Sequence, residues 1–164
     1  MWWGGATPAA ARLAVDFCEG WLPGRITFPT YEARVKKITQ MTAEQGKPMI
    51  MTGALPITSI DDTFASAAER MNVPGLIKNA NAQKFWVKPP SGEFTKIEEL
   101  DGSILAGDPD DIVRGVQRYQ ELGCDLLIFD LRMRFPDYLE HIRILATEVL
   151  PRVSGRATAA AAVR

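Results

Sequence analysis

The stretch Trp2-Trp3-Gly4-Gly5-Ala6-Thr7-Pro8-Ala9 has the pattern of a buried strand end, a tight turn and a helix start. Two apolar residues suit the strand, and two glycines permit positive φ and close approach of another group. Thr7 suits the N-cap and Pro8 the first helical position. Because a helix N-terminus presents free N–H groups and the positive end of the helix dipole, this turn is a ready phosphate site. The same residues also fit a plain βα turn without a ligand.

The pattern of a strand followed by a turn and a helix repeats along the first half of the chain. Apolar spacing predicts a first helix over residues 7–18, which buries Ala10, Leu13, Ala14 and Phe17. Further elements are expected as a short strand at 21–22, a helix capped by Thr30 that runs to about 45, a buried strand over 49–55, and a helix opened by Asp61 and Asp62 that runs to 71.

Residues 72–102 break this rhythm. They contain a short helix (74–85) and the segment Pro89-Pro90-Ser91-Gly92, without a single dominant element. Such a long irregular stretch is typical of a lid or binding insertion, and a surface excursion packed on the outside is the alternative.

The last third returns to the βα pattern. Asp108-Pro109 opens a helix to Leu122 that buries Ile112, Val113, Val116 and Tyr119. Residues 125–130 form the most apolar strand, which predicts burial on both faces. A final helix is expected from Pro136 to Pro151, with its apolar face made by Tyr138, Ile142, Leu145 and Val149. Residues 154–164 are predicted to be a disordered tail.

The alternation predicts an α/β fold with a parallel sheet of four strands and right-handed crossovers. Half a TIM barrel and a small open sheet both fit this pattern. In either case ligands bind at the carboxyl ends of the strands. The segments expected there are residues 4–7, 23–27, 52–57 and 130–134.

Composition limits the classes of function. The chain has 164 residues, enough for one domain, and its net charge of −1 gives no reason to expect a nucleic-acid or membrane partner. No apolar run reaches the length of a membrane span and no signal peptide is visible, so a cytoplasmic location is expected. Cys18 and Cys124 are interpreted as reduced core residues, and the single histidine, His141, predicts no metal site.

Several of these segments resemble the luciferase-like flavin monooxygenases. Residues 3–10 and 16–22 are similar to that family's Gly-Gly-x-Ser/Thr-Pro-Ala-Ala and Ala-Asp-Gly-Trp signature. Residues 105–111, 123–129 and 146–151 are similar to its Gly-x-Pro helix opening, to its last strand and to its usual ending. These segments are distributed from residue 3 to residue 151, in the family's order and spacing.

The resemblance implies the C-terminal half of a TIM (β/α)8 barrel, strands five to eight, with an insertion after the third strand of this chain. Residues 1–153 would then be a partial barrel domain, with 72–102 as insertion or lid. It also implies an oxidoreductase or monooxygenase whose cofactor is FMN or, alternatively, a deazaflavin coenzyme, with its phosphate at Gly4, Gly5, Ala6 and Thr7. The partners implied are a flavin, a small organic substrate, and either further copies of the chain or a missing N-terminal half.

Other candidate side chains follow from position. Arg25 would lie at the ligand end of the second strand, where it pairs with a phosphate or a substrate anion, or is an ordinary surface arginine. Arg132 follows the last strand beside Asp130, as a weak candidate for substrate binding or as a structural ion pair. Trp21 and Trp86 fit cofactor walls but fit apolar packing better, and His141 is expected on a helix surface.

No catalytic residue is identified, because the strand over residues 49–55 carries no ionisable group where some family members have histidine or arginine. Two functions remain open. One is a flavin-dependent oxidoreductase, inactive as a fragment. The other is a non-catalytic half-barrel that serves in assembly or regulation. A small phosphate-binding α/β enzyme is a third.

Overall fold

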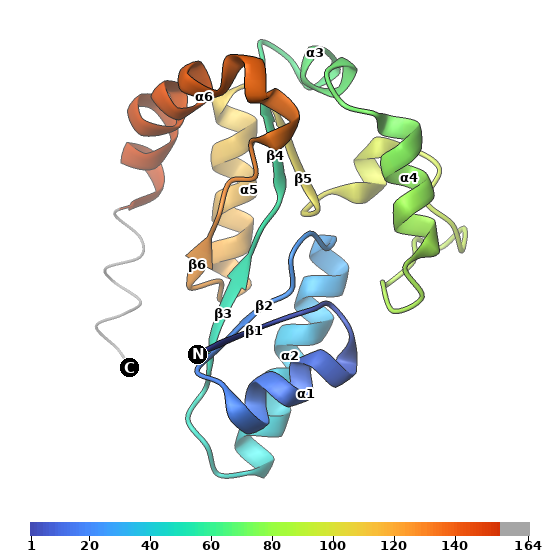
Figure 1. The fold of residues 1–164 in the computed structure, drawn as a ribbon, viewed down its shortest axis with the longest axis vertical. Coiled ribbons are helices and arrows are strands. Elements are labelled where there is room, and N and C mark those ends of the chain that lie inside the picture. Colours follow the sequence, from blue (N-terminus) through green and yellow to red (C-terminus); the bar gives the residue numbers. More distant parts are fainter. Residues whose placement is uncertain (155–164) are drawn as a thin grey trace.

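The computed structural model describes residues 1–154, and the tail expected from residue 155 onward lies outside them. Its strands are β1 (Trp2–Gly4), β2 (Gly20–Leu22), β3 (Met51–Ala54), β4 (Ile57–Ile60), β5 (Ile104–Gly107) and β6 (Leu126–Leu127). Its α-helices are α1 (Pro8–Phe17), α2 (Phe28–Glu44), α3 (Phe64–Glu69), α4 (Val73–Ala82), α5 (Pro109–Glu121) and α6 (Tyr138–Ile144). Short 3₁₀-helices η1 (Ile97–Leu100) and η2 (Arg132–Asp137), and a π-helix η3 (Leu145–Val149), complete the fold (Figure 1).

The main sheet is parallel, as predicted. Its strand order is β1-β2-β3-β6, so each strand pairs with the next one along the chain once β4 and β5 are set aside. A sequential order of this kind also occurs within (β/α)8 barrels, whereas a doubly wound sheet reverses its strand order at a switch point. The prediction of four strands was incomplete. β4 continues directly from β3 and pairs in parallel with β5, on the far side of the insertion.

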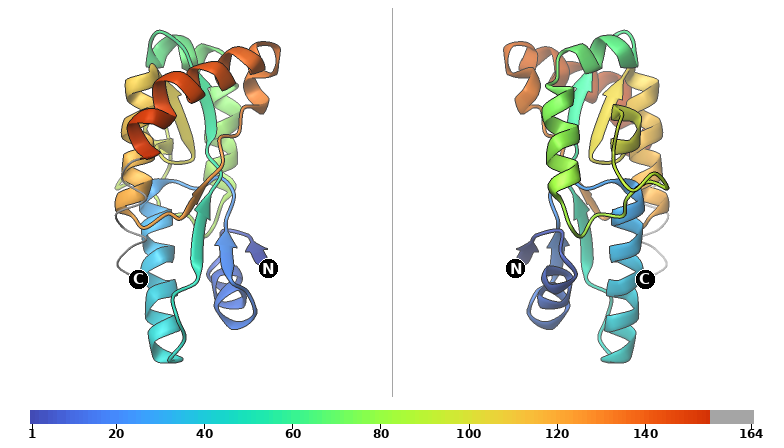
Figure 2. Two further views of the ribbon diagram at one scale, coloured as in Figure 1. Left: turned by 90° about the vertical axis from the view of Figure 1, so that its left-hand side faces the viewer. Right: turned by 90° about the vertical axis from the view of Figure 1, so that its right-hand side faces the viewer.

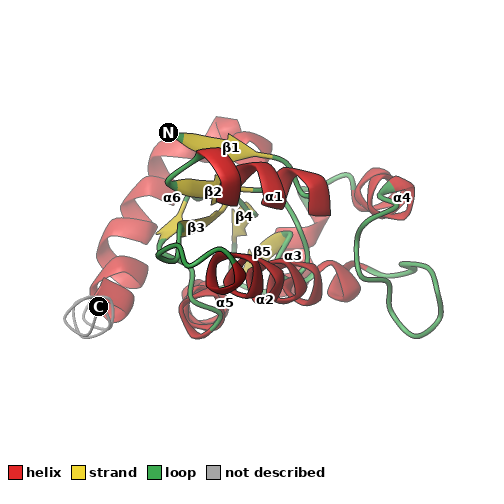
Figure 3. Ribbon diagram, turned by 90° about the horizontal axis from the view of Figure 1, so that it is seen from below, coloured by secondary structure: helices red, strands yellow, loops and turns green. Residues whose placement is uncertain are grey.

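One face of the sheet carries the core. Helices α1, α2 and α5 gather on this side (Figure 3), and most of their buried apolar residues belong to one cluster with Trp21 and Ala54. The predicted face of α5 is confirmed, since Ile112, Val113, Val116 and Tyr119 are all buried.

The prediction for α1 was half wrong. Its buried residues are Ala10, Ala11, Ala14 and Val15, whereas Leu13 and Phe17 are exposed. The buried positions of α1 are thus three alanines and a valine, and its larger apolar residues are exposed.

The other face of the sheet is open. The Trp2 ring lies over Gly20, where a Cβ would stand 2.5 Å from it, and reaches Gly53. Trp2 itself is 36% exposed, and Met51 and Leu126 on the same sheet are also exposed. The predictions that β1 and the strand at 125–130 are buried were therefore wrong. The two strands are the edges of the sheet, and burial of an edge depends on a neighbour rather than on its own apolar residues.

Two of the predicted helix starts were correct and two were wrong. Thr7 caps α1 by accepting a hydrogen bond from the N–H of Ala10 (3.1 Å), and Asp108 caps α5. Helix α2 starts at Phe28 after Thr27, so Thr30 is not its cap; the Thr30 hydroxyl instead bonds that of Thr27. Helix α3 is capped by Thr63, later than Asp61 and Asp62 indicated.

The end of the chain differs most from the expectation. Pro136 lies inside η2, Tyr138 and Ile142 are each 42% exposed, and the helical segment continues past Pro151 to Ser154. Only Leu145 and Val149 of the predicted apolar face are buried, because the segment crosses the end of the sheet instead of lying along it (Figure 1).

Residues 72–102 stand to one side of the sheet, with α4 as their main element (Figure 2). They have a small core of their own with β4 and β5, to which Ile57, Ala80, Phe94, Leu100 and Ile104 belong. Residues 72–102 therefore pack onto the extension of the sheet, β4 and β5, that the sequence did not predict.

Cys18 and Cys124 are free thiols, each half-buried rather than in the core. Among residues 1–154, no helix combines the length and the apolar character needed to cross a bilayer.

Candidate functional site

A cavity of about 690 Å³ lies at the carboxyl ends of the main strands. Each strand contributes a residue to its wall: Ala6 follows β1, Arg25 follows β2, Leu55 follows β3 and Arg132 follows β6. The parallel topology brings these four together, since all carboxyl ends meet at one edge of the sheet. Three residues singled out from the sequence, Ala6, Arg25 and Arg132, thus share one cavity.

The glycine turn forms one rim of this cavity. Gly5 has φ of +109°, which a side chain would strain, whereas Gly4 keeps a negative φ. The carbonyl of Gly5 accepts a hydrogen bond from Trp21 Nε1 (2.9 Å), and that of Ala6 accepts one from Arg34 Nε (3.1 Å). Of the residues in this turn, Ala6 lines the cavity wall, and Gly4, Gly5 and Thr7 do not. The Thr7 hydroxyl accepts from the Ala10 N–H, so its own proton remains to be donated.

Arg132 is held by a buried carboxylate. Its Nε donates to Asp130 Oδ1 (2.7 Å) and its Nη2 to Asp130 Oδ2 (2.6 Å), in the two-pronged geometry that suits arginine. The Asp130 side chain is 4% exposed and that of Arg132 is 72% exposed. The guanidinium holds the pKa of Asp130 below its ordinary value. The expected ion pair is present, and it presents Arg132 at the cavity.

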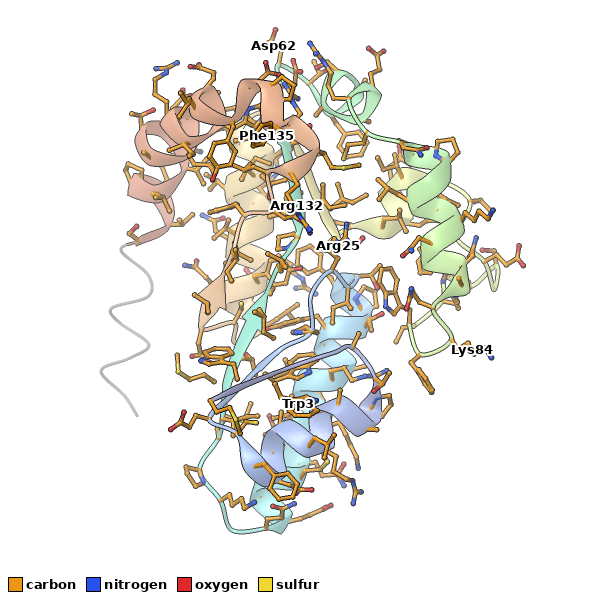
Figure 4. All side chains as sticks on the ribbon, viewed as in Figure 1. Trp3, Arg25, Asp62, Lys84, Arg132 and Phe135 are labelled. Carbon is orange, nitrogen blue, oxygen red and sulfur yellow. The ribbon has the colours of Figure 1, made fainter. Side chains whose placement is uncertain are left out.

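Arg25 is exposed and, within residues 1–154, makes no hydrogen bond or ion pair at bonding distance. Its charge still acts on Asp130, and it lines the same cavity as Arg132, in the middle of the molecule (Figure 4). An arginine that the fold does not use is available to a ligand.

The opposite wall comes from the insertion, and sequence reasoning missed most of it. Asn72, Asn79 and Gln83 supply amides from α4 and its ends, and Leu76 supplies an apolar surface. Trp86 lines the cavity and also packs against both core clusters, so the two interpretations of this residue coexist. The amides at 72, 79 and 83 share one side of a helix by their spacing, and this is the signal that could have identified them.

Two other aromatic candidates serve the fold. Trp21 is fully buried, packs on Tyr31 and bonds the Gly5 carbonyl, so it is not a wall of the cavity. His141 is 2% exposed, which overturns its expected place on a helix surface. Its Nε2 accepts from the N–H of Ile60 (3.1 Å), and Nδ1 lies 3.0 Å from the carbonyl of Asp137.

The cavity wall carries cations and amides but no proton-transfer group. The residues that line it include no Asp, Glu, His, Cys, Lys or Tyr. No group of three or more metal-binding side chains occurs within residues 1–154. These residues can bind and orient an anionic or amide-bonding ligand, and the reacting group would come from that ligand or from a cofactor.

Comparisons with known proteins place the fold. No protein-family model matches the sequence, and no curated protein matches it.

Solved structures do match. An F420-dependent secondary alcohol dehydrogenase bound to an F420-acetone adduct is 19% identical, with a TM-score of 0.69 over 93% of this chain and 48% of its own. The coenzyme F420-dependent tetrahydromethanopterin reductase of Methanopyrus kandleri is 18% identical, with a TM-score of 0.62 over 92% of this chain and 50% of its own. The FMN-bound oxygenating constituent of 3,6-diketocamphane monooxygenase from Pseudomonas putida is 13% identical, with a TM-score of 0.60 over 93% and 48%.

The chain thus spans about half the length of the solved structures it matches. Those neighbours are flavin- or F420-dependent oxidoreductases. At these identities the likeness concerns the fold: an α/β chain with parallel sheets that matches luciferase-like TIM-barrel proteins over about half of their length.

Proposed function

We propose that this chain is the cofactor-binding half of a flavin-dependent oxidoreductase or monooxygenase of the luciferase-like type. FMN is the proposed cofactor and a deazaflavin the alternative, since the neighbours of this fold include proteins of both kinds. The observation that carries the proposal is the meeting of Ala6, Arg25, Leu55 and Arg132, from four successive strand ends, on one cavity without an acidic residue. A bound flavin would supply the hydride or oxygen chemistry, for which the wall itself has no group.

The turn Gly4-Gly5-Ala6-Thr7 would hold the phosphate. The positive φ of Gly5 turns the chain directly into α1, whose first N–H groups and dipole favour an anion. Thr7 would add its free hydroxyl proton. Residues 72–102 would act as the lid, because α4 forms the wall opposite the strand ends.

The proposal includes a second half-barrel. The sheet face around Trp2, Met51 and Leu126 is apolar and exposed, and no strand within residues 1–154 pairs with the outer side of either edge strand. Four further strands, or another copy of this chain, would cover that face and pair those edges. Light scattering of the purified chain at tens of micromolar should therefore show dimers or larger species. A homogeneous monomer with a sharp melt would contradict this part of the proposal.

The cofactor is tested by titrating FMN and riboflavin, which differ by the phosphate, into the 164-residue chain. Flavin fluorescence reports binding, and FMN should bind at least tenfold more tightly than riboflavin. Coenzyme F420 in a parallel titration separates the two cofactor classes. Absence of binding for all three by a folded chain would overturn the oxidoreductase proposal and favour a non-catalytic assembly role.

The phosphate position is tested at Ala6, which is half-buried at the rim of the cavity. Ala6→Asp and Ala6→Asn add side chains of nearly equal size, and only the first adds a negative charge. Ala6→Asp should weaken FMN binding about tenfold more than Ala6→Asn does, and riboflavin should distinguish the two variants little. Equal effects on both ligands would remove the phosphate from this turn.

A further inference from the structure

We infer that Arg25 and Arg132, with Asp130 behind them, form a subsite for the anionic group of the substrate, which is an organic carboxylate with an apolar body. The identification of this ligand as a substrate rests on the proposed function. The subsite itself rests on the charges and contacts of the cavity alone.

The charge of the wall differs from that of the chain. The whole sequence has 20 acidic and 19 basic residues, yet the wall of this cavity carries two arginines and no carboxylate. Two guanidinium groups in one cavity repel each other, so an unoccupied pair costs electrostatic energy that a bound anion removes. A neutral or cationic ligand would leave this repulsion in place.

Asp130 positions one of the two groups without neutralising the pair. It uses both carboxylate oxygens on Arg132, and one of them also accepts the Arg132 backbone N–H (3.2 Å). The Nη1 group of Arg132 makes no hydrogen bond to residues 1–154, and Arg25 keeps all of its donors. One carboxylate therefore serves two arginines, which leaves one positive charge and a set of oriented donors for a ligand.

The rest of the wall selects the body of the ligand. Leu55, Ile57, Leu76 and Met133 present apolar surface, and Asn79 and Gln83 present amides. A carboxylate on an aliphatic body matches this combination, with its head at the arginines and its chain along the apolar side. The phosphate of a flavin shares the anionic chemistry, so the experiment must separate the two sources.

The test uses hexanoate, 1-hexanol and hexylamine, which share one alkyl chain and differ in charge. Isothermal titration of the 164-residue chain should show hexanoate binding at least tenfold more tightly than 1-hexanol, and hexylamine more weakly still. Arg25→Gln and Arg132→Gln should each weaken hexanoate at least tenfold and change 1-hexanol less than twofold. Arg12→Gln, the same change at an exposed position of α1 outside the cavity, should leave all three unchanged.

Asp130→Asn is the test of positioning. It keeps the shape and removes the charge that orients Arg132, so the arginine Nε–H resonance in the NMR spectrum should shift and hexanoate affinity should change. Unchanged hexanoate binding in both arginine variants, or 1-hexanol binding as tightly as hexanoate, would overturn the subsite.

The two sources of the anion are separated by a second titration. Hexanoate is added to the chain saturated with FMN and to the chain saturated with riboflavin. Equal hexanoate affinity in the two cases supports a substrate subsite. Loss of hexanoate binding with FMN alone assigns the arginines to the flavin phosphate and overturns the substrate inference. Hexanoate binding in a chain that binds no flavin keeps the anion subsite and removes the oxidoreductase proposal instead.

Discussion

Two arginines that stand two residues apart in η2 have opposite surroundings. The Arg132 side chain is 72% exposed and lines the strand-end cavity, whereas that of Arg134 is 7% exposed. Arg134 donates to Ser59 Oγ (3.1 Å) and forms ion pairs with Asp61 (3.3 Å) and Asp137 (3.2 Å). Arg134 thus joins β4 and the residue that follows it to η2, whereas Arg132 keeps donors for a ligand.

Burial determines what each of these two chemically identical side chains can do. A buried guanidinium must be matched by fixed partners, and removing it leaves those partners without a charge to balance them. An exposed guanidinium held by one carboxylate contributes little to stability, because water screens it, and so it can be reserved for binding. Substitutions in the two regions should therefore differ in kind.

The largest effect is expected at Arg134. Arg134→Met fills a similar volume but leaves Ser59, Asp61 and Asp137 without their common donor, so unfolding free energy should fall by about 2–3 kcal/mol. Urea denaturation followed by circular dichroism measures this. Arg132→Met is the matched control and should cost less than about 1 kcal/mol. If the two variants lose equal stability, the comparison fails.

His141 extends the buried region and should come second. His141→Leu removes the acceptor for the buried N–H of Ile60, and an unsatisfied buried donor costs about 1–3 kcal/mol. His141→Gln keeps an acceptor of similar reach and should lose less. Equal losses in thermal denaturation for the leucine and glutamine variants would show that the ring contributes packing alone.

Asp130 should show a smaller effect that depends on pH. The folded chain holds the Asp130 pKa below its unfolded value of 3.8, chiefly through the hydrogen bond from Arg132. Between the folded and the unfolded pKa of Asp130, the unfolded state therefore binds more protons than the folded state. The stability that the ionised carboxylate contributes is lost as pH falls through the folded pKa. Because Arg132 is largely exposed, Asp130→Asn should cost only about 0.5–1 kcal/mol above about pH 5, and this difference should shrink below about pH 4.

The measurement is urea denaturation of wild type and Asp130→Asn across that range. Arg132→Gln removes the partner of Asp130, so it should also reduce the dependence of the unfolding free energy on pH in this range. A difference that stays constant down to the acid limit would mean that the ion pair is not what Asp130 contributes to stability.

The smallest effect on stability is expected at Arg25. Arg25→Gln removes an exposed side chain without a bonded partner in the described chain, so unfolding free energy should change by less than about 0.5 kcal/mol. The same variant should lose hexanoate binding, which sharpens the contrast with Arg134. A stability loss above about 1 kcal/mol would place Arg25 among the structural arginines.

The sequence alone determined the local elements whose signals lie within a few residues. Thr7 and Asp108 cap helices because their oxygens reach the first free N–H groups, and Gly5 takes the positive φ that other residues avoid. The buried face of α5 follows from its periodicity. The βα alternation was enough to place Ala6, Arg25 and Arg132 at one end of a parallel sheet.

What the tertiary structure decided is burial and long-range pairing. β4 and β5 pair with each other although residues 72–102 lie between them in the sequence. No local signal in Ile57–Ile60 predicts that Ile104–Gly107 is its partner. β1 and β6 have the apolar residues of buried strands but lie at open edges, and His141 becomes buried because η2 and α6 cross the end of β4. The amides of α4 and its ends line the cavity because the course of residues 72–102 places this helix beside the strand ends. A residue's own chemistry sets what it can do locally, but its exposure and partners depend on segments far away in the chain.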